Sequence, residues 1–188
     1  MSISLHPNLL EEAFLYFAKF PKLEGVKSSM FRMGSTTIQG YDSLKTAISE
    51  LSKNSITPEI LNFLFSANEE KLKSGIEDTK GIFMLLDYGQ LSSSLDNLHR
   101  QNDEFELGII IAQKMKQEDY DMAEILLIQD QMLNIMRAVR EQMRKDSVCN
   151  PFVQQLKLPS RISPWYAREL CNATGFSMNF TKSGVEMI

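Results

Sequence analysis

The longest regular pattern of apolar positions lies in the second half of the chain. Intervals of three and four residues alternate there, which is typical of the a and d positions of a heptad repeat. The members of this seam are Met122, Ile125, Gln129, Met132, Met136, Val139 and Met143. The seam predicts a helix over about 119–145, with acidic residues at its start and Arg144 and Lys145 at its end, as the helix dipole favours.

Weaker helical periodicity surrounds this segment. Leu10, Phe14 and Phe17 recur behind Pro7 and predict a helix over about 7–20. Cap residues and apolar stripes predict further helices over 42–51, 58–65 with a continuation to 73, 79–87, 90–101 and 164–175, and a short helix or turn over 151–156. Residues 105–115 are rich in β-branched side chains, which favours a buried strand. The charges that flank this segment favour a helix instead, and the sequence leaves both alternatives open.

Two segments carry a β signal. Residues 29–33 and 36–39 flank Gly34-Ser35, and glycine at the first central position suits a two-residue hairpin turn. The apolar residues in the first arm of this hairpin are Met30, Phe31 and Met33. In residues 176–181 apolar and polar side chains alternate, which indicates an extended strand that pairs with the hairpin or with a partner.

These patterns predict a mainly α fold. With 188 residues, of which 43% are hydrophobic, the chain is long enough for one well-packed domain. We expect a single helical domain over 1–175, a bundle of seven or eight helices around the helix 119–145, with a small β-hairpin near 29–39. Residues 176–188 are expected to form a C-terminal tail.

Charge is unevenly distributed along the chain. The formal net charge is −4, which gives no overall basic field for binding nucleic acid. The last third nevertheless carries an excess of basic side chains, so an anionic partner would prefer it. The candidate anion-binding residues are Arg137, Arg140, Arg144, Lys145, Lys157, Arg161 and Arg168.

Few residues suggest catalysis. The sequence lacks the common phosphate-loop, dinucleotide, zinc-protease and serine-hydrolase motifs, and its acidic clusters do not match a calcium loop, so we expect no catalytic residue, metal or cofactor. Cys149 and Cys171 have no metal-like spacing and indicate a reducing compartment. A thiol nucleophile at Cys149 with His99 as its base remains an alternative, because such partners meet in space and not in sequence.

The absence of catalytic motifs and the methionine-rich seam favour a binding function. Methionine adapts to irregular or changeable partners, and Gln129 inside the seam can fix register or oligomeric state. Apolar neighbours such as Leu126 and Leu133 widen the stripe, which favours burial inside the bundle. We therefore expect an adaptor, chaperone-like factor or assembly subunit that binds a protein partner or itself through the seam or through Met30, Phe31 and Met33.

Two further expectations concern the alternatives and the location. The first alternative function is a nucleic-acid-associated regulator or viral-type accessory factor that uses the basic last third, and the second is a small thiol enzyme.

No cationic segment precedes the first apolar residues, so no signal peptide is expected. No apolar run approaches the roughly 20 residues that cross a bilayer, so we expect a cytoplasmic or host-intracellular protein without a transmembrane segment.

Overall fold

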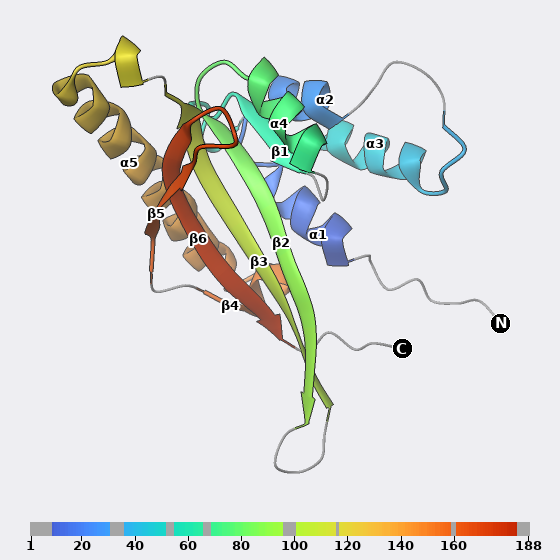
Figure 1. The fold of residues 1–188 in the computed structure, drawn as a ribbon. Helices are drawn as coiled ribbons and strands as arrows, with labels where there is room; N and C mark the ends of the chain where they lie inside the picture. The colour runs from blue at the N-terminus through green and yellow to red at the C-terminus, as the bar shows by residue number, and fades with distance from the viewer. Residues whose placement is uncertain are drawn as a thin grey trace.

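A strongly curled sheet of six strands organises the protein, with helices on both of its faces (Figure 1). The computed structural model describes residues 9–30, 36–51, 55–65, 69–95, 101–115, 117–158 and 161–183. The architecture is α/β, so the prediction of a mainly α helical bundle is wrong. The long helix predicted over 119–145 is present, but it packs on the sheet and not on other long helices.

The sheet is mixed, and its strands are not in sequence order. The order is β1-β2-β3-β6-β4, and β5 also pairs with β6. Only β1 and β2 run parallel, and every other pair is antiparallel. The strands are β1 (Asn62–Phe65), β2 (Phe83–Leu95), β3 (Gln101–Lys114), β4 (Leu156–Lys157), β5 (Ser163–Ala167) and β6 (Ala173–Ser183). The last long strand therefore lies inside the sheet, between β3 and the pair formed by β4 and β5.

Six α-helices and one short 3-10 helix occur in the described part of the chain. They are α1 (Leu9–Phe17), α2 (Leu23–Met30), α3 (Tyr41–Glu50), α4 (Glu69–Asp78), the 3-10 helix η1 (Gln117–Asp119), α5 (Met122–Asp146) and α6 (Pro151–Gln154). None of these helices combines the length and the apolarity that crossing a membrane requires.

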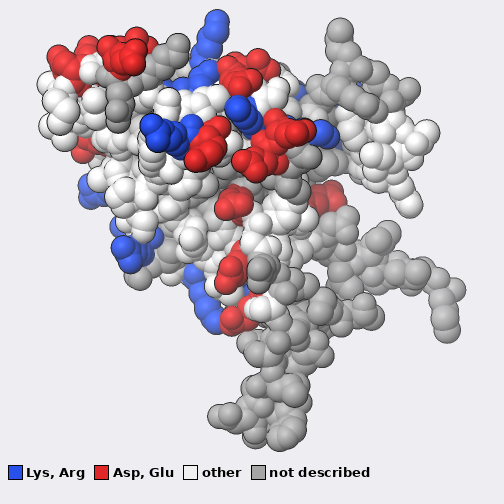
Figure 2. Space-filling view, in the orientation of Figure 1, with Lys and Arg blue, Asp and Glu red and all other residues white. Residues whose placement is uncertain are grey.

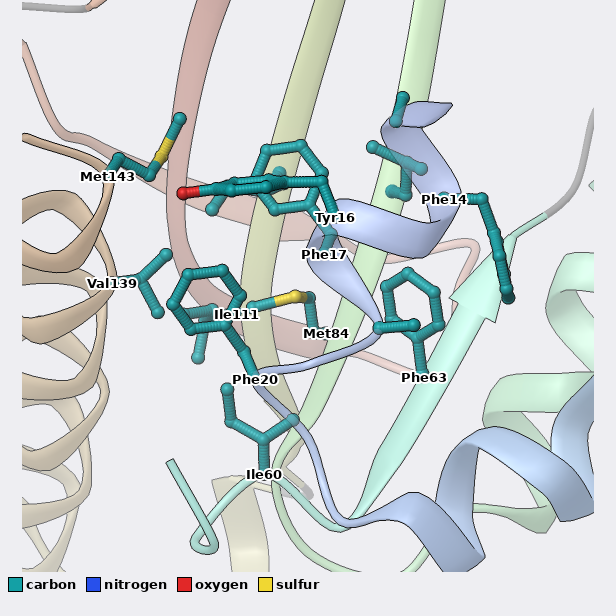
Figure 3. Close-up of a cluster of buried hydrophobic side chains, with 14 of the residues drawn as sticks. Phe14, Tyr16, Phe17, Phe20, Ile60, Phe63, Met84, Ile111, Val139 and Met143 are labelled. Carbon is teal, nitrogen blue, oxygen red and sulfur yellow. The ribbon is translucent and has the colours of Figure 1, made fainter. Parts of the chain in front are cut away.

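The main core lies on the side of the sheet that faces α1 and α5 (Figure 3). Phe14 and Phe17 of α1 enter it, and the Phe17 ring stacks on Phe180 of β6 with 5.5 Å between the ring centroids. A smaller core on the opposite side joins Ile76 of α4 to Phe83 of β2. This smaller core covers one part of the second face of the sheet, and another part of that face carries polar side chains.

Three of the predicted helices are strands. Residues 79–87 and 90–101 were expected to be helical, but 83–95 form β2 and β3 begins at Gln101. Residues 105–115, where helix competed with strand, belong largely to β3. Residues 83–86 and 109–111 are buried on both faces, so no polar alternation marks them as strands. Pairing with segments distant in the sequence decides their structure.

Two further predicted helices are wrong over much of their length. Residues 62–65 form β1, although the expected continuation to 73 is helical from Glu69 as part of α4. Residues 163–167 form β5, where Pro164 is tolerated because β5 is paired on one side only among the described residues. Gly175 does not end a helix. It lies in β6, and a Cβ there would come within 2.0 Å of the Ile111 carbonyl oxygen, so glycine permits the close approach of β6 to β3.

The hairpin predicted near 29–39 is not formed by its described residues. Met30 ends the helix α2, and residues 36–40 lead through a turn into α3. Phe31 and Met33 lie outside the described residues. The alternating segment that begins at 176 belongs to β6, and its pairing partners are β3, β4 and β5.

Candidate protein-binding surface

The helix α5 has its own start signal, and its first turns extend past the sheet (Figure 1). The Asp121 carboxylate accepts a hydrogen bond from the Glu124 backbone amide at 2.8 Å, and the Glu124 carboxylate accepts one from the Asp121 amide at 2.9 Å. This reciprocal capping box satisfies two amides that a helix start otherwise leaves without partners. The first turns of α5 are thus stabilised locally, by a cap rather than by packing.

The C-terminal part of the predicted seam is core. Side chains of this part face the sheet, and four of them have no solvent exposure: Met132, Met136, Val139 and Met143. Further toward the helix start, the Gln129 amide donates to the Thr174 hydroxyl of β6 at 2.9 Å. Ile125, one turn earlier, is half-buried. Contact between the seam and the sheet therefore weakens steadily toward the start of the helix.

Three large apolar side chains are exposed at that start. Met122 is 81% exposed, Leu126 67% and Leu127 69%. We call residues 122–127 the N-terminal turns of α5. Met122 belongs to the predicted seam, and Leu126 was expected to be buried in a bundle that does not exist, whereas Leu127 was assigned to neither. The exposure of Met122 follows from the position of the sheet edge, which no local pattern in the sequence reports, whereas Leu126 and Leu127 lie on the side of α5 that is exposed along its length.

The solvent side of α5 separates charge along its length. We call this side the outer face of α5, and its exposed members are Ala123, Leu126, Leu127, Asp130, Asn134, Arg137, Ala138, Glu141, Arg144 and Lys145. The N-terminal half is acidic, with Glu124 and Asp130 after Asp121, and the C-terminal half is basic. Figure 2 shows acidic side chains over η1 and the start of α5, and basic ones lower on the same edge.

The predicted anion-binding residues are spread over three elements. Arg137, Arg140, Arg144 and Lys145 lie on α5, Lys157 on β4, and Arg161 and Arg168 flank β5. Two of them have acidic partners: Arg144 bonds to Glu141 at 2.9 Å and Lys157 to Glu104 at 2.5 Å. The Nε of Arg140 is buried without a hydrogen-bond partner in the described structure. Anion binding by this set stays a prediction.

Met30 lines an apolar groove of about 500 Å³ at the other end of the molecule. The groove lies between α1, α2, α3 and β1, and its lining residues are Leu9, Leu10, Glu11, Phe14, Met30, Leu44 and Phe65. Segments outside the described residues adjoin Leu9, Met30 and Phe65 in the chain. The groove is therefore a weaker candidate than the N-terminal turns of α5, whose chain neighbours are described almost completely.

The described structure adds no support for the alternative of a thiol nucleophile at Cys149 with His99 as its base. Cys149 is exposed in the turn after α5, and His99 lies outside the described residues. Cys171 and Asn172 both have positive φ, 59° and 54°, in the turn that joins β5 to β6. They line a pocket of about 420 Å³ together with Lys114 and Glu77. Within the described ranges, no three His, Cys, Asp or Glu residues are arranged to hold a metal ion.

The uncovered part of the second sheet face is polar. Gly108 of β3 is paired with Asp87 of β2 and Asn179 of β6, and the Asn179 amide oxygen would lie 2.8 Å from a Cβ at Gly108. These residues line a shallow depression of about 240 Å³ together with Glu106. Figure 2 shows acidic side chains spaced down this face. Solvated acidic side chains explain why the face needs no cover.

A partly buried polar cluster fixes the C-terminal end of α5. The Tyr16 hydroxyl of α1 donates to the Asp146 carboxylate at 2.8 Å, Gln142 donates to it at 2.8 Å, and Lys19 forms an ion pair with it. Burial, the hydrogen bond and the Asp146 charge raise the pKa of Tyr16. Burial acts to raise the pKa of Asp146, but the hydrogen bonds from Lys19, Tyr16 and Gln142 outweigh it and lower that pKa.

Comparison with known proteins adds no functional assignment. No protein-family model matches the chain, and neither a curated protein nor a solved structure does. The candidate surface therefore rests on the chain's own geometry.

Proposed function

We propose that this protein is a non-catalytic interaction module, an adaptor, chaperone-like factor or assembly subunit that binds another protein through the N-terminal turns of α5. The observation that carries the proposal is the exposure of Met122, Leu126 and Leu127 within six residues of one capped helix. Other large exposed apolar side chains of the described chain are scattered over other elements: Ile38, Ile56, Leu61, Val148 and Tyr166. Scattered apolar residues are ordinary, whereas contiguous ones mark interaction sites.

The arrangement suits recognition of a helix by a groove. Met122 and Leu126 are four residues apart and lie one above the other on the helix surface, and Leu127 points about 100° away from Leu126 around the helix. An amphipathic helix that places such residues in an apolar groove is a recurring mode of protein binding. The helix is rigid before binding because its C-terminal half is core, so little conformational entropy is lost on association.

The test is site-specific photo-crosslinking in the native cell. A photoreactive phenylalanine analogue in place of Leu127 is expected to form covalent adducts with a bound protein. The matched control is the same analogue at Ile38, which is 72% exposed and lies on a different element. We expect adducts at Leu127 that are absent at Ile38, and we expect Leu126→Glu in the same chain to remove them.

The same experiment can reject the proposal. Leu126 is exposed, so the Glu variant is expected to keep its circular dichroism spectrum and thermal unfolding midpoint. Equal labelling at Leu127 and Ile38, or adducts that persist in the Leu126→Glu chain, would show that the N-terminal turns of α5 are ordinary surface.

A further inference from the structure

The two halves of the outer face of α5 are complementary in charge. The half before Asn134 carries Asp130, and the half after it carries Arg137, Arg144 and Lys145, with Glu141 bonded to Arg144. These side chains are exposed. One helix thus carries acidic charge toward its start and basic charge toward its end. A second identical helix that lies antiparallel to it brings opposite charges together.

We propose that the outer face of α5 binds the same face of a second copy of this chain, with the two helices antiparallel and a twofold axis near Asn134. The proposal rests on the proposed function, because it names the partner of the same helix. With the axis at Asn134, Asp130 lies beside Arg137 of the second copy, on the same flank of the helix pair. Twofold symmetry repeats each contact, so every favourable pair occurs twice.

Small and apolar side chains complete the contact. Ala138 lies level with Asp130 of the second copy and allows the helices to approach closely, because alanine fills little space between them. Leu127 then lies over Ala138 and the aliphatic stem of Lys145. Leu127 at the start of each helix is thereby covered by the C-terminal half of the other.

The expected association is weak and sensitive to salt. The 25 residues of α5 span about 37 Å, and one crossing of two helices lies at the lower end of the area that specific interfaces bury. Exposed ion pairs are also screened at high ionic strength. Dimers should therefore be populated at high protein concentration and low salt, and the dissociation constant should rise as salt is added.

Charge reversal with a mixed sample tests the register. Asp130→Arg and Arg137→Glu each replace two attractive contacts of the dimer by two repulsive ones, and we expect each to raise the dissociation constant at least about tenfold. An equimolar mixture of the two variants restores opposite charges at both contacts, so heterodimers are expected to form. Light scattering and sedimentation equilibrium measure the mass against the 21.5 kDa monomer.

Matched controls carry the same charge changes elsewhere. Glu59→Arg and Lys80→Glu alter exposed residues outside α5 and are expected to dimerise like the unaltered chain. Every altered side chain is exposed, and circular dichroism checks that each variant folds. The proposed pairing would be overturned if both charge-reversal variants kept the dissociation constant of the unaltered chain. It would also be overturned if each variant were monomeric alone and the equimolar mixture formed no heterodimer.

The outcomes also separate this inference from the proposed function. An unaltered chain that stays monomeric at every concentration and at low salt overturns self-association. If Leu127 still gives adducts with a different protein, the proposed function survives that result. If monomeric chain binds duplex DNA or RNA through Arg137, the basic half serves an anion and the self-pairing is wrong. No adduct together with a monomer would end both proposals.

Discussion

The two halves of α5 carry the same seam and have opposite environments. Met136 is fully buried against the sheet, whereas Met122, fourteen residues earlier and two heptads away in the pattern, is 81% exposed. The ends are also held differently. Asp146 is tied to Tyr16 of α1 and to Lys19 just after that helix, while at the start the side chains of Asp121 and Glu124 bond to each other's backbone amides.

The difference shows that a heptad pattern reports which side of a helix is apolar but not where its partner ends. The sheet covers the seam from Gln129 onward and leaves the turns before it in solvent. A surface for another protein can therefore arise when an ordinary core stripe continues past the edge of the core.

The largest expected effect comes from placing a charge at equivalent seam positions in the two halves. Met136→Glu puts a carboxylate in the main core and should reduce the free energy of unfolding by more than about 4 kcal/mol. Met122→Glu should change it by less than about 0.5 kcal/mol, because the side chain is already in solvent. Chemical denaturation of both variants measures the contrast. Similar losses in the free energy of unfolding of both variants would show that the two halves of α5 do not differ in burial.

A second prediction concerns the anchored end of α5. Asp146→Asn removes the charge that Lys19 pairs with, and we expect a loss of about 2 kcal/mol in the free energy of unfolding. Because the pKa of Asp146 is lower in the folded protein, its contribution is present above about pH 4, the pKa of an unfolded aspartate, and is lost as pH falls through the folded pKa.

The pH dependence distinguishes this contribution from a packing effect. The difference in unfolding free energy between the unaltered chain and Asp146→Asn should shrink below about pH 4. Denaturant titrations at pH 7 and at successively lower pH measure it. A difference that is constant with pH would mean that the carboxylate charge does not stabilise the anchor.

The same anchor gives a smaller effect at high pH. Tyr16→Phe removes one hydrogen bond and should cost about 1 kcal/mol at neutral pH. The pKa of Tyr16 is raised by folding, so the unaltered chain should lose stability as pH rises above about 10, where unfolded tyrosine ionises. The Phe variant should lack this part of the loss. Unfolding curves at pH 9 and at pH 11 test the difference.

The smallest expected effect is at the projecting end. Asp121→Ala removes the hydrogen bond that the Asp121 carboxylate accepts from the Glu124 amide. The loss should destabilise the first turn of α5 locally by about 1 kcal/mol. Amide hydrogen exchange should quicken at residues 122–125 and stay unchanged at 132–143. Uniformly faster exchange along the whole helix would show that its two halves form one cooperative unit, contrary to the comparison.

The sequence predicted helices where a local signal exists. The long helix, its acidic start and its basic end follow from spacing and charge. The helix predicted over 42–51 is also present as α3, but it begins at Tyr41 with Gly40 as its N-cap, so Asp42 lies in its first turn and does not cap it. The sheet was missed because its central strands carry apolar residues on both faces and charged residues at their ends, which also fits a helix. The β-branched run at 109–111 and the alternation over 176–181 were the local signs of strands in this sheet.

The candidate surface was predicted only in part. Met122 was selected by its place in the seam, whereas Leu126 was assigned to a bundle core and Leu127 was assigned to neither. The exposure of Met122 depends on where β6 and β5 cease to cover the seam, and these strands lie more than 35 residues later in the chain. Hydrophobic periodicity cannot carry information about the edge of a sheet built from such distant segments.

The central place of β6 has a consequence for how the chain acquires its structure during synthesis. Until residues 173–183 have left the ribosome, β3 lacks one of its two neighbours and β4 and β5 have no strand to pair with. The seam of α5 then has an incomplete surface to cover, and Met132 and Met136 remain available to other apolar chains. Completion of the sheet and of the core under α5 therefore waits until β6 has been synthesised, and the nascent chain should depend on chaperones until then.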